Sequence, residues 1–350
     1  MPYGTWLNTN RKIDTSSPLL SGIMTGITSE TLDKNISWAG QQSSQPIYRD
    51  VYTIFWNDNN SQHKTIFVGT DLSISADGVA SGVIEEVKDM ILIDGFYGPD
   101  FLQIGRMSVD FQILRSVLSS TTFSDDIELF RTIFSNGNGI SGSRYDDNLT
   151  SYDGNDILTP QEGNDFLDGG QGIDRVTFND QFAMSKIFAD FSGETVVLTP
   201  QDGIDTLRNI ERLIFVDKII ALDIEGNAGQ AYRIYQAAFD RKPDPTGLGF
   251  WIANLDLGKT LSTIADEFLN SPEFNALYGS STPNASFVDS LYQNVLHRAG
   301  ETEGVEYWNG LLNNGISRAD VLVAFSESAE NKAAVLGSIQ NGIEYKEFLG

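Results

Sequence analysis

Apolar residues follow the period of β-strands over the first hundred positions of the chain. Runs rich in β-branched and aromatic side chains alternate with polar turns, as expected of half-buried strands. From Ser108 the apolar spacing becomes helical, and a second short helix is expected after Ser124. The pattern predicts a β-rich N-terminal domain over residues 1–134, with helices near 108–134. The strand-like runs are 51–56, 65–69 and 83–93.

A nine-residue repeat occupies the middle of the chain. In rows of nine from Gly142 the sequence reads GSRYDDNLT, SYDGNDILT, PQEGNDFLD and GGQGIDRVT. The eighth position is always aliphatic, and glycines recur where a backbone would have to turn tightly. Each row is therefore expected to form one short inward-facing strand and one turn. The sixth position is always aspartate (Asp147, Asp156, Asp165, Asp174), and the turn glycines include Gly154, Gly163, Gly170 and Gly172.

These rows resemble the calcium-binding nonapeptides of RTX, or hemolysin-type, proteins, and the last row is an unmodified G-G-x-G-x-D-x-U-x. The resemblance implies a short parallel β-roll, with its capping strands, over residues 135–223. Two rows make one coil, so Asp147 pairs with Asp165 and Asp156 pairs with Asp174. Ca²⁺ takes about six to eight oxygen ligands, which aspartates and backbone carbonyls of stacked turns would supply.

Two well-formed Ca²⁺ sites are expected from these pairs. A weaker third site is expected where Asn138, in the row before Gly142, stacks beneath Asp156. Asp205 lies in a segment that repeats the G-x-D-x-L spacing once more, and it is expected to form a detached turn near the end of the roll.

Residues 228–337 have helical spacing and contain a second repeat, with an offset of 57 residues between 234–274 and 291–331. The N-caps expected for its helices are Asp244, Ser271 and Ser317, and Gly258 and Gly315 are expected at helix ends. The aromatic residues Tyr235, Tyr292, Trp251 and Trp308 are expected in its core.

This region resembles the DUF4214 family through R-x-P-D-x-x-G-L-x-x-W, which begins at Arg241, and through S-P-E-F, which begins at Ser271. The resemblance implies an all-α domain that often accompanies RTX repeats, and it supplies no activity. The chain as a whole is therefore predicted to be a multidomain α+β protein.

The charge balance narrows the function. The chain has 48 acidic and 23 basic residues, a net charge of −25, which argues against nucleic acid or an anionic membrane as a partner. It has no cysteine and two histidines, so a cysteine-based zinc site and a Ser-His-Asp triad lack candidates. No run is long and apolar enough for a transmembrane span, and the N-terminus lacks the pattern of a classical signal peptide.

The chain resembles a type I secretion substrate. The resemblance implies a secreted, extracellular protein that folds with Ca²⁺ after export by a type I secretion apparatus, and association with the cell surface stays open. Residues 338–350 are the expected secretion tail. A non-enzymatic role in adhesion or an extracellular matrix is favoured, with a surface protein or polysaccharide as partner. Two alternatives stay open. One is a hydrolase with its site in the N-terminal domain, and the other is a small-molecule or haem carrier that uses His63 and Tyr97.

Overall fold

The computed structural model describes most of the chain in two compact units. Unit 1 comprises Met1–Ile210 with Ile214–Val216, and unit 2 comprises Glu211–Leu213 with Asp217–Gly350. The predicted boundary near residue 134 falls inside unit 1. The described residues are 6–8, 27–38, 47–57, 62–75, 80–93, 96–97, 102–114, 128–129, 131, 137, 139–279 and 282–348.

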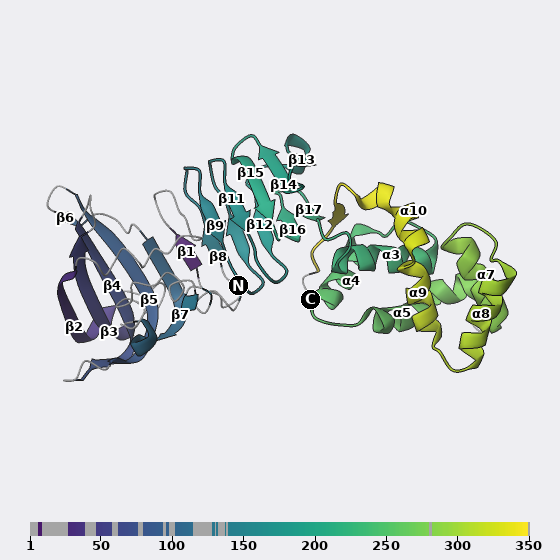
Figure 1. The fold of residues 1–350 in the computed structure, drawn as a ribbon, viewed down its shortest axis with the longest axis horizontal. Helices are drawn as coiled ribbons and strands as arrows, with labels where there is room; N and C mark the ends of the chain where they lie inside the picture. Colours follow the sequence, from purple (N-terminus) through teal and green to yellow (C-terminus); the bar gives the residue numbers. More distant parts are fainter. Residues whose placement is uncertain are drawn as a thin grey trace. The chain divides into compact units, whose positions relative to one another are not determined.

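Unit 1 begins with an antiparallel sheet, in the strand order β1-β7-β5-β4-β3-β2, with β6 paired to β5 (Figure 1). Its core includes Tyr52, Phe67 and Phe111, whose rings contact one another with centroids 5.0 and 5.8 Å apart. The predicted strand runs lie within β3, β4 and β5. The strands are β1 (Trp6–Asn8), β2 (Ile27–Trp38), β3 (Ile47–Asn57), β4 (Gln62–Ile74), β5 (Ala80–Ile93), β6 (Phe96–Tyr97) and β7 (Leu102–Asp110).

The helix predicted from Ser108 begins later in the structure. Val109 and Asp110 pair with Ile84 and Val83 as the last residues of β7, and helical backbone begins at Phe111. The prediction was wrong at this boundary because pairing with a neighbouring strand outweighs a local helical spacing. Of the second predicted helix, the described residues 128, 129 and 131 are helical.

The four repeat rows and the row before Gly142 together form five strands of three residues, and each strand has a buried central residue. Strands β8, β10 and β12 pair in parallel in one sheet, and β9 and β11 pair in parallel in another. Successive strands thus alternate between the two sheets (Figure 1). The central residues Ile140, Leu149, Leu158, Leu167 and Val176 are at most 1% exposed. The strands are β8 (Gly139–Ser141), β9 (Asn148–Thr150), β10 (Ile157–Thr159), β11 (Phe166–Asp168) and β12 (Arg175–Thr177).

After the fourth row the chain leaves this stack and then returns to it. The excursion contains η2 (Phe182–Met184), β13 (Lys186–Ala189) and β14 (Thr195–Thr199). The chain re-enters as β15 (Gly203–Arg208), which pairs in parallel with β11, Leu207 opposite Leu167. Strand β14 covers the other edge of β15 in antiparallel pairing. Strand β16 (Arg212–Ile214) follows along the chain.

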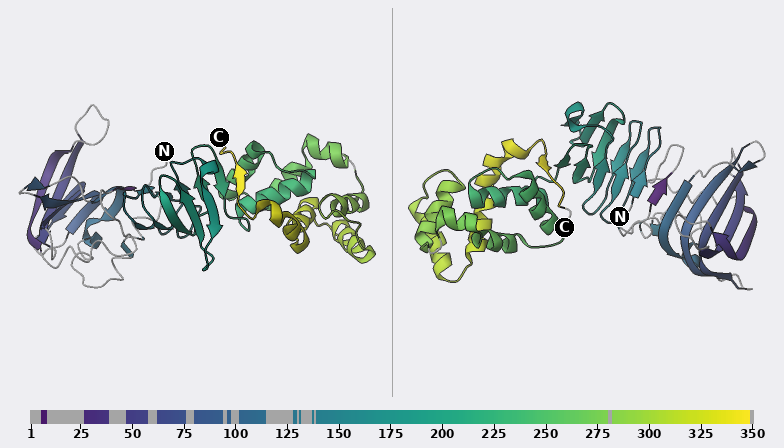
Figure 2. Two further views of the ribbon diagram at one scale, coloured as in Figure 1. Left: turned by 90° about the horizontal axis from the view of Figure 1, so that it is seen from above. Right: turned by 180° about the vertical axis from the view of Figure 1, so that it is seen from behind.

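Unit 2 is built mainly of helices (Figure 2), which the sequence repeat divides into two sets of four. Strands β17 (Ile219–Ala221) and β18 (Ile343–Tyr345) pair in antiparallel fashion, so part of the predicted secretion tail packs within the unit. The first copy has α3 (Asn227–Phe239), α4 (Pro245–Asp256), α5 (Leu261–Leu269) and α6 (Pro272–Tyr278); the second has α7 (Asn284–Asn294), α8 (Thr302–Asn313), α9 (Arg318–Ser326) and α10 (Ala329–Ile339).

The predicted helix caps of unit 2 are confirmed. Ser271 Oγ accepts the Phe274 N–H at 3.1 Å, and Asp244 caps α4 in the same way. Gly258 and Gly315 follow α4 and α8 with φ of 87° and 96°, the left-handed region that favours glycine at a helix end. The third predicted cap, Ser317, accepts the Asp320 N–H.

Among the expected core aromatics, Tyr235 and Tyr292 are buried, and Trp251 and Trp308 pack partly buried against the core.

The second repeat keeps the polar contacts of the first as well as its helices. Arg241 forms a two-point ion pair with Glu273, and Arg298 forms one with Glu330, with Nε–Oε1 distances of 2.8 and 2.6 Å. Each guanidinium also lies over a tyrosine ring of its own repeat. The arginine of the motif therefore connects the loop after the first helix of each repeat to the last helix, which carries the glutamate.

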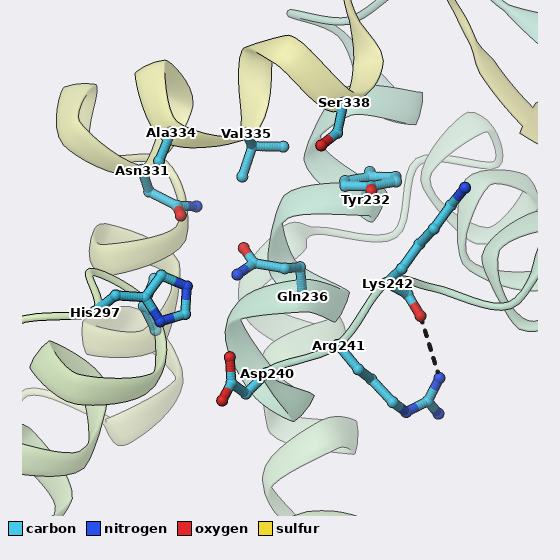
Figure 3. A pocket seen from close by; sticks show the side chains of 11 residues that line it. Tyr232, Gln236, Asp240, Arg241, Lys242, His297, Asn331, Ala334, Val335 and Ser338 are labelled. Carbon is cyan, nitrogen blue, oxygen red and sulfur yellow. Dashed lines mark hydrogen bonds between the residues drawn. The ribbon is translucent and has the colours of Figure 1, made fainter.

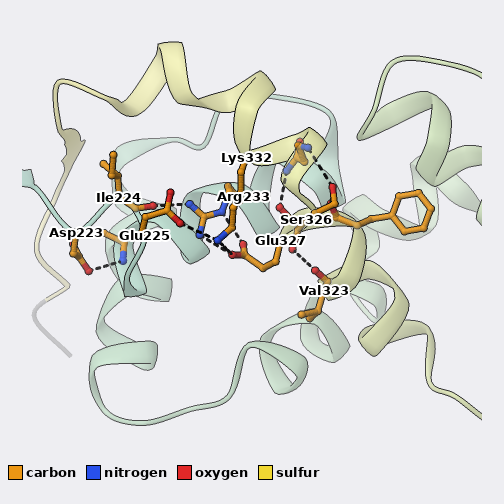
Figure 4. A network of polar contacts seen from close by, with 12 residues as sticks. Asp223, Ile224, Glu225, Arg233, Val323, Ser326, Glu327 and Lys332 are labelled. Carbon is orange, nitrogen blue, oxygen red and sulfur yellow. Dashed lines mark hydrogen bonds and ion pairs between the residues drawn. The ribbon is translucent and has the colours of Figure 1, made fainter.

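A buried arginine joins the two copies. Arg233 of α3 donates to both carboxylate oxygens of Glu327, at 2.8 and 2.7 Å, and to the Ile224 carbonyl (Figure 4). A charge removed from water in this way is tolerated because every contact is charge-assisted.

Among the described residues, no helix has the length and apolar character to cross a membrane. The predicted coarse architecture, mixed α+β with a β-rich N-terminal part and a helical C-terminal region, is confirmed.

Candidate metal centre

The sixth-position aspartates lie on top of one another at the points where the turns enter the strands. Asp165 Oδ1 accepts the backbone N–H of Asp147 at 2.7 Å, and Asp205 Oδ1 accepts the N–H of Asp165 at 3.0 Å. All three side chains are at most 3% exposed. One side of the stack thus carries a ladder of three aspartates, in which the carboxylates of Asp165 and Asp205 each accept a backbone N–H of the preceding coil.

The opposite side repeats the arrangement with the other two rows. Asp174 Oδ1 accepts the N–H of Asp156 at 2.8 Å, and both side chains are fully buried. The sequence-based pairing of Asp147 with Asp165 and of Asp156 with Asp174 thus corresponds to direct contacts. Asn138, the expected partner of the third site, lies outside the described residues.

In two carboxylates of the first ladder the charged form is disfavoured. The Oδ2 atoms of Asp165 and Asp205 are buried and have no hydrogen-bond partner among the described residues. Burial raises the pKa of Asp165 to about 7 and that of Asp205 to about 8. The charged neighbours add to the effect, because those that act on Asp165 are Asp147, Asp146 and Asp202, all negative.

The turn glycines bring the backbones of stacked turns unusually close. A methyl group on Gly172 would lie 1.8 Å from the Gly154 carbonyl oxygen, and one on Gly170 would lie 1.7 Å from the Tyr152 oxygen. Gly154, Gly163, Gly170 and Gly172 also have φ between 87° and 144°. Only glycine fits such positions, and the close approach places rows of carbonyl oxygens beside the carboxylates.

These groups fit a hard divalent cation. Carboxylate and backbone carbonyl oxygens are the ligands that Ca²⁺ prefers, and two buried carboxylate oxygens have no donor to compensate them. In the part of the chain that the structure describes, no three acidic or histidine side chains converge on one point. A site here would therefore depend on backbone carbonyls from two stacked turns for much of its coordination.

Two buried acids that the nine-residue rows did not reveal, Asp180 and Asp202, lie at the two ends of the excursion before Asp205. Asp202 accepts the Asn179 N–H at 3.0 Å and Asp180 accepts the Gln201 N–H at 2.8 Å, so the start of the excursion is tied to its end. Burial raises the pKa of Asp202, and the Asp180 charge raises it further. An alignment of PQEGNDFLD (160–168) with PQDGIDTLR (200–208) would have revealed this fifth row.

Comparisons with known proteins address the helical part. Residues 265–335 match the domain of unknown function DUF4214. The match begins within α5 and ends within α10, so it covers less than the predicted 228–337. No curated protein matches the chain.

A solved structure, the extracellular lipase LipA from Serratia marcescens, is similar over 24% of this chain and 13% of the lipase, at 22% identity and a TM-score of 0.22. The chain thus matches only a small part of the lipase, and the likeness carries no argument about function.

The side chains of His63 and Tyr97, on which the haem-carrier alternative depends, lie outside the described residues.

Proposed function

We propose that the stacked turns between Gly142 and Arg208 form a calcium-binding β-roll of the RTX type. The observation that carries the proposal is the pair of buried, uncompensated Oδ2 atoms on Asp165 and Asp205, with pKa values raised to about 7 and about 8. Carboxylates in such surroundings either take up protons or bind a cation. A divalent ion between stacked turns would neutralise both.

Ca²⁺ fits this environment better than other common cations. The groups around the ladder are carboxylate and carbonyl oxygens, which suit a hard ion. The turns offer many carbonyls in a flexible arrangement, as Ca²⁺ accepts, whereas Mg²⁺ requires a strict octahedron. Ions on one side of the stack would be held by Asp147, Asp165 and Asp205. Ions on the other side would be held by Asp156 and Asp174.

Ion binding and folding would be coupled in this design. Without the ion, the negative charges of Asp147, Asp165 and Asp202 repel one another and destabilise the stack. With it, the binding free energy contributes to folding. We propose that the roll stays unfolded at the low free calcium of a cytoplasm and folds outside the cell, after export by a type I apparatus.

We propose a non-enzymatic role for the exported protein, as a cell-surface or matrix component. The net charge of −25 and the duplicated helical unit support it, because such a chain stays soluble once calcium is bound and presents a second, independent module. The binding partner would be a surface protein or polysaccharide.

Calcium titration of the full chain tests the ion site. We expect strand signal in circular dichroism to rise with calcium in wild type, and calorimetry to show fewer bound ions for Asp165→Asn. Asp190→Asn is the matched control, because this exposed carboxylate caps a turn of the excursion away from the ladder. Unchanged strand signal and no bound calcium in wild type would overturn the proposal.

A further inference from the structure

A cavity of 320 Å³ is lined by residues of both helical repeats, and beside it the two repeats differ in packing. At the offset of 57 residues, Asn331 and Val335 of α10 stand where α6 has Phe274 and Tyr278. In the first repeat those two rings stack at 4.1 Å, and both are buried. The second repeat replaces two packed rings with smaller side chains, and the cavity lies beside them.

The cavity wall carries hydrogen-bond acceptors that have no donor. Asn331 is fully buried, and its Oδ1 has no hydrogen-bond partner among the described residues, nor has Oε1 of Gln236. The orientation of Asn331 is fixed, because its Nδ2 donates to the Ser326 carbonyl at 2.8 Å. Both amides and the ring of His297 face a common space in Figure 3.

The charged groups around the cavity favour a positively charged ligand. The Asp240 carboxylate lies at the same end as the two amides, whereas the Arg241 guanidinium is already paired with Glu273. Lys242 extends toward the opposite end from His297 (Figure 3). Buried acceptors next to a carboxylate suit a group that only donates hydrogen bonds and carries positive charge.

We propose that this cavity binds a primary ammonium group, held by the Asp240 carboxylate and, once neighbouring side chains move aside to expose them, by Asn331 Oδ1 and Gln236 Oε1. Its volume admits a small aliphatic amine or amino acid, at the lower end of the range for ligand pockets. The ammonium group satisfies the two orphaned acceptors, each of which is costly to leave buried and unpaired. A carboxylate at the far end of the ligand would meet Lys242.

The test measures binding of three probes of similar length to the full chain, by ligand-observed NMR and thermal shift: cadaverine, 6-aminohexanoate and hexanoate. We expect the two ammonium compounds to bind and hexanoate, which lacks the ammonium, not to bind. Binding of 6-aminohexanoate alone would identify an amino acid as the source of the group, and equal binding of cadaverine would identify a free amine. Binding of hexanoate as strong as that of cadaverine, or no binding of either amine, would overturn the proposal.

The first repeat provides the filling variants. Asn331→Phe and, separately, Val335→Tyr introduce the side chains found at the matching positions of α6, and each should abolish amine binding. Asp240→Asn should weaken it about fivefold, the equivalent of one partly exposed charge contact. Asp266→Asn, an exposed carboxylate on α5, is the charge-matched control. Amine binding that persists in both filled variants would show that the cavity is not the site.

Discussion

Replacement of Asp205 by asparagine should stabilise the stack without calcium and weaken it with calcium. The folded pKa of Asp205 is about 8, against an ordinary value of 3.8, because its carboxyl is buried. Each unit of pKa shift corresponds to ~1.4 kcal/mol, so at pH 8 this carboxyl destabilises the calcium-free fold by about 5 kcal/mol. Asparagine keeps an oxygen for the Asp165 N–H but carries no charge.

The expected net gain is smaller than this figure. The amide nitrogen takes the place of Oδ2 and must find an acceptor, and an unpaired buried donor costs about 1–3 kcal/mol. We therefore expect Asp205→Asn to increase the local stability in chelator at pH 8 by about 2–4 kcal/mol. With saturating calcium the sign should reverse, because the variant loses a charged ligand.

Hydrogen exchange gives a local readout in this multidomain chain. The Asp165 amide donates to Asp205 Oδ1 at 3.0 Å, so its exchange reports the opening of this coil. In chelator at pH 8 the amide should exchange more slowly in Asp205→Asn than in wild type. Asp190→Asn is the control of opposite sign, because hydrogen bonds from Ser192 lower the pKa of Asp190. Faster exchange in Asp205→Asn than in the control, in chelator, would refute the electrostatic reasoning.

Three further predictions follow from the same contacts. The free energy of unfolding of the calcium-free stack should fall as pH rises from about 4 to about 8, because Asp165 and Asp205 hold protons in the fold that the unfolded chain has released. Urea unfolding midpoints of the calcium-free protein across that range check this prediction, and a midpoint that rises with pH would contradict it. Gly172→Ala should destabilise the stack by more than about 1 kcal/mol, because its methyl would meet the Gly154 oxygen. Gly193→Ala, also at a positive φ (87°, against 144° for Gly172) but with open space, should cost only backbone strain, so its melting temperature should fall less. Arg212→Gln should cost about 3–5 kcal/mol in denaturant unfolding of the helical unit, because the fully buried guanidinium is paired with two carboxylates, and a loss below about 1 kcal/mol would count against it.

The strict register of the repeat rows made the short strands predictable from the sequence, because a buried aliphatic at the eighth position of every row leaves one orientation for each strand. The pairing of Asp156 with Asp174 was expected only from the two-row coil that the resemblance to RTX repeats implies, and the structure brings these two residues into contact. The fifth row was expected only as a detached turn at Asp205, because Phe178–Thr199 separates it from the fourth row; in the structure it is not detached but pairs with β11. Pairing across such an interruption depends on β11 offering a free edge to β15, which local sequence does not encode.

The helix caps were predictable from local sequence, whereas the start of the helix at Phe111 and the cavity depend on contacts with distant residues. Caps such as Asp244 and Ser271 act within one turn and were predictable from short motifs. The start of the helix at Phe111 was not, because β5 holds the preceding residues in a strand. The alignment of the repeats contained the exchange of Phe274 for Asn331, but only the packing of α10 shows that a cavity results.

The excursion after the fourth row also determines where the stack can stop. A parallel coil ends in an open strand edge to which another chain could add, and repeated addition of this kind leads to fibres. Strand β14 occupies that edge on β15, and beyond it lies only the four-residue β13, which is mostly exposed and begins with Lys186. A four-residue outer strand that begins with lysine is a poor template for self-assembly. The hairpin therefore limits the addition of another chain at this edge of the sheet.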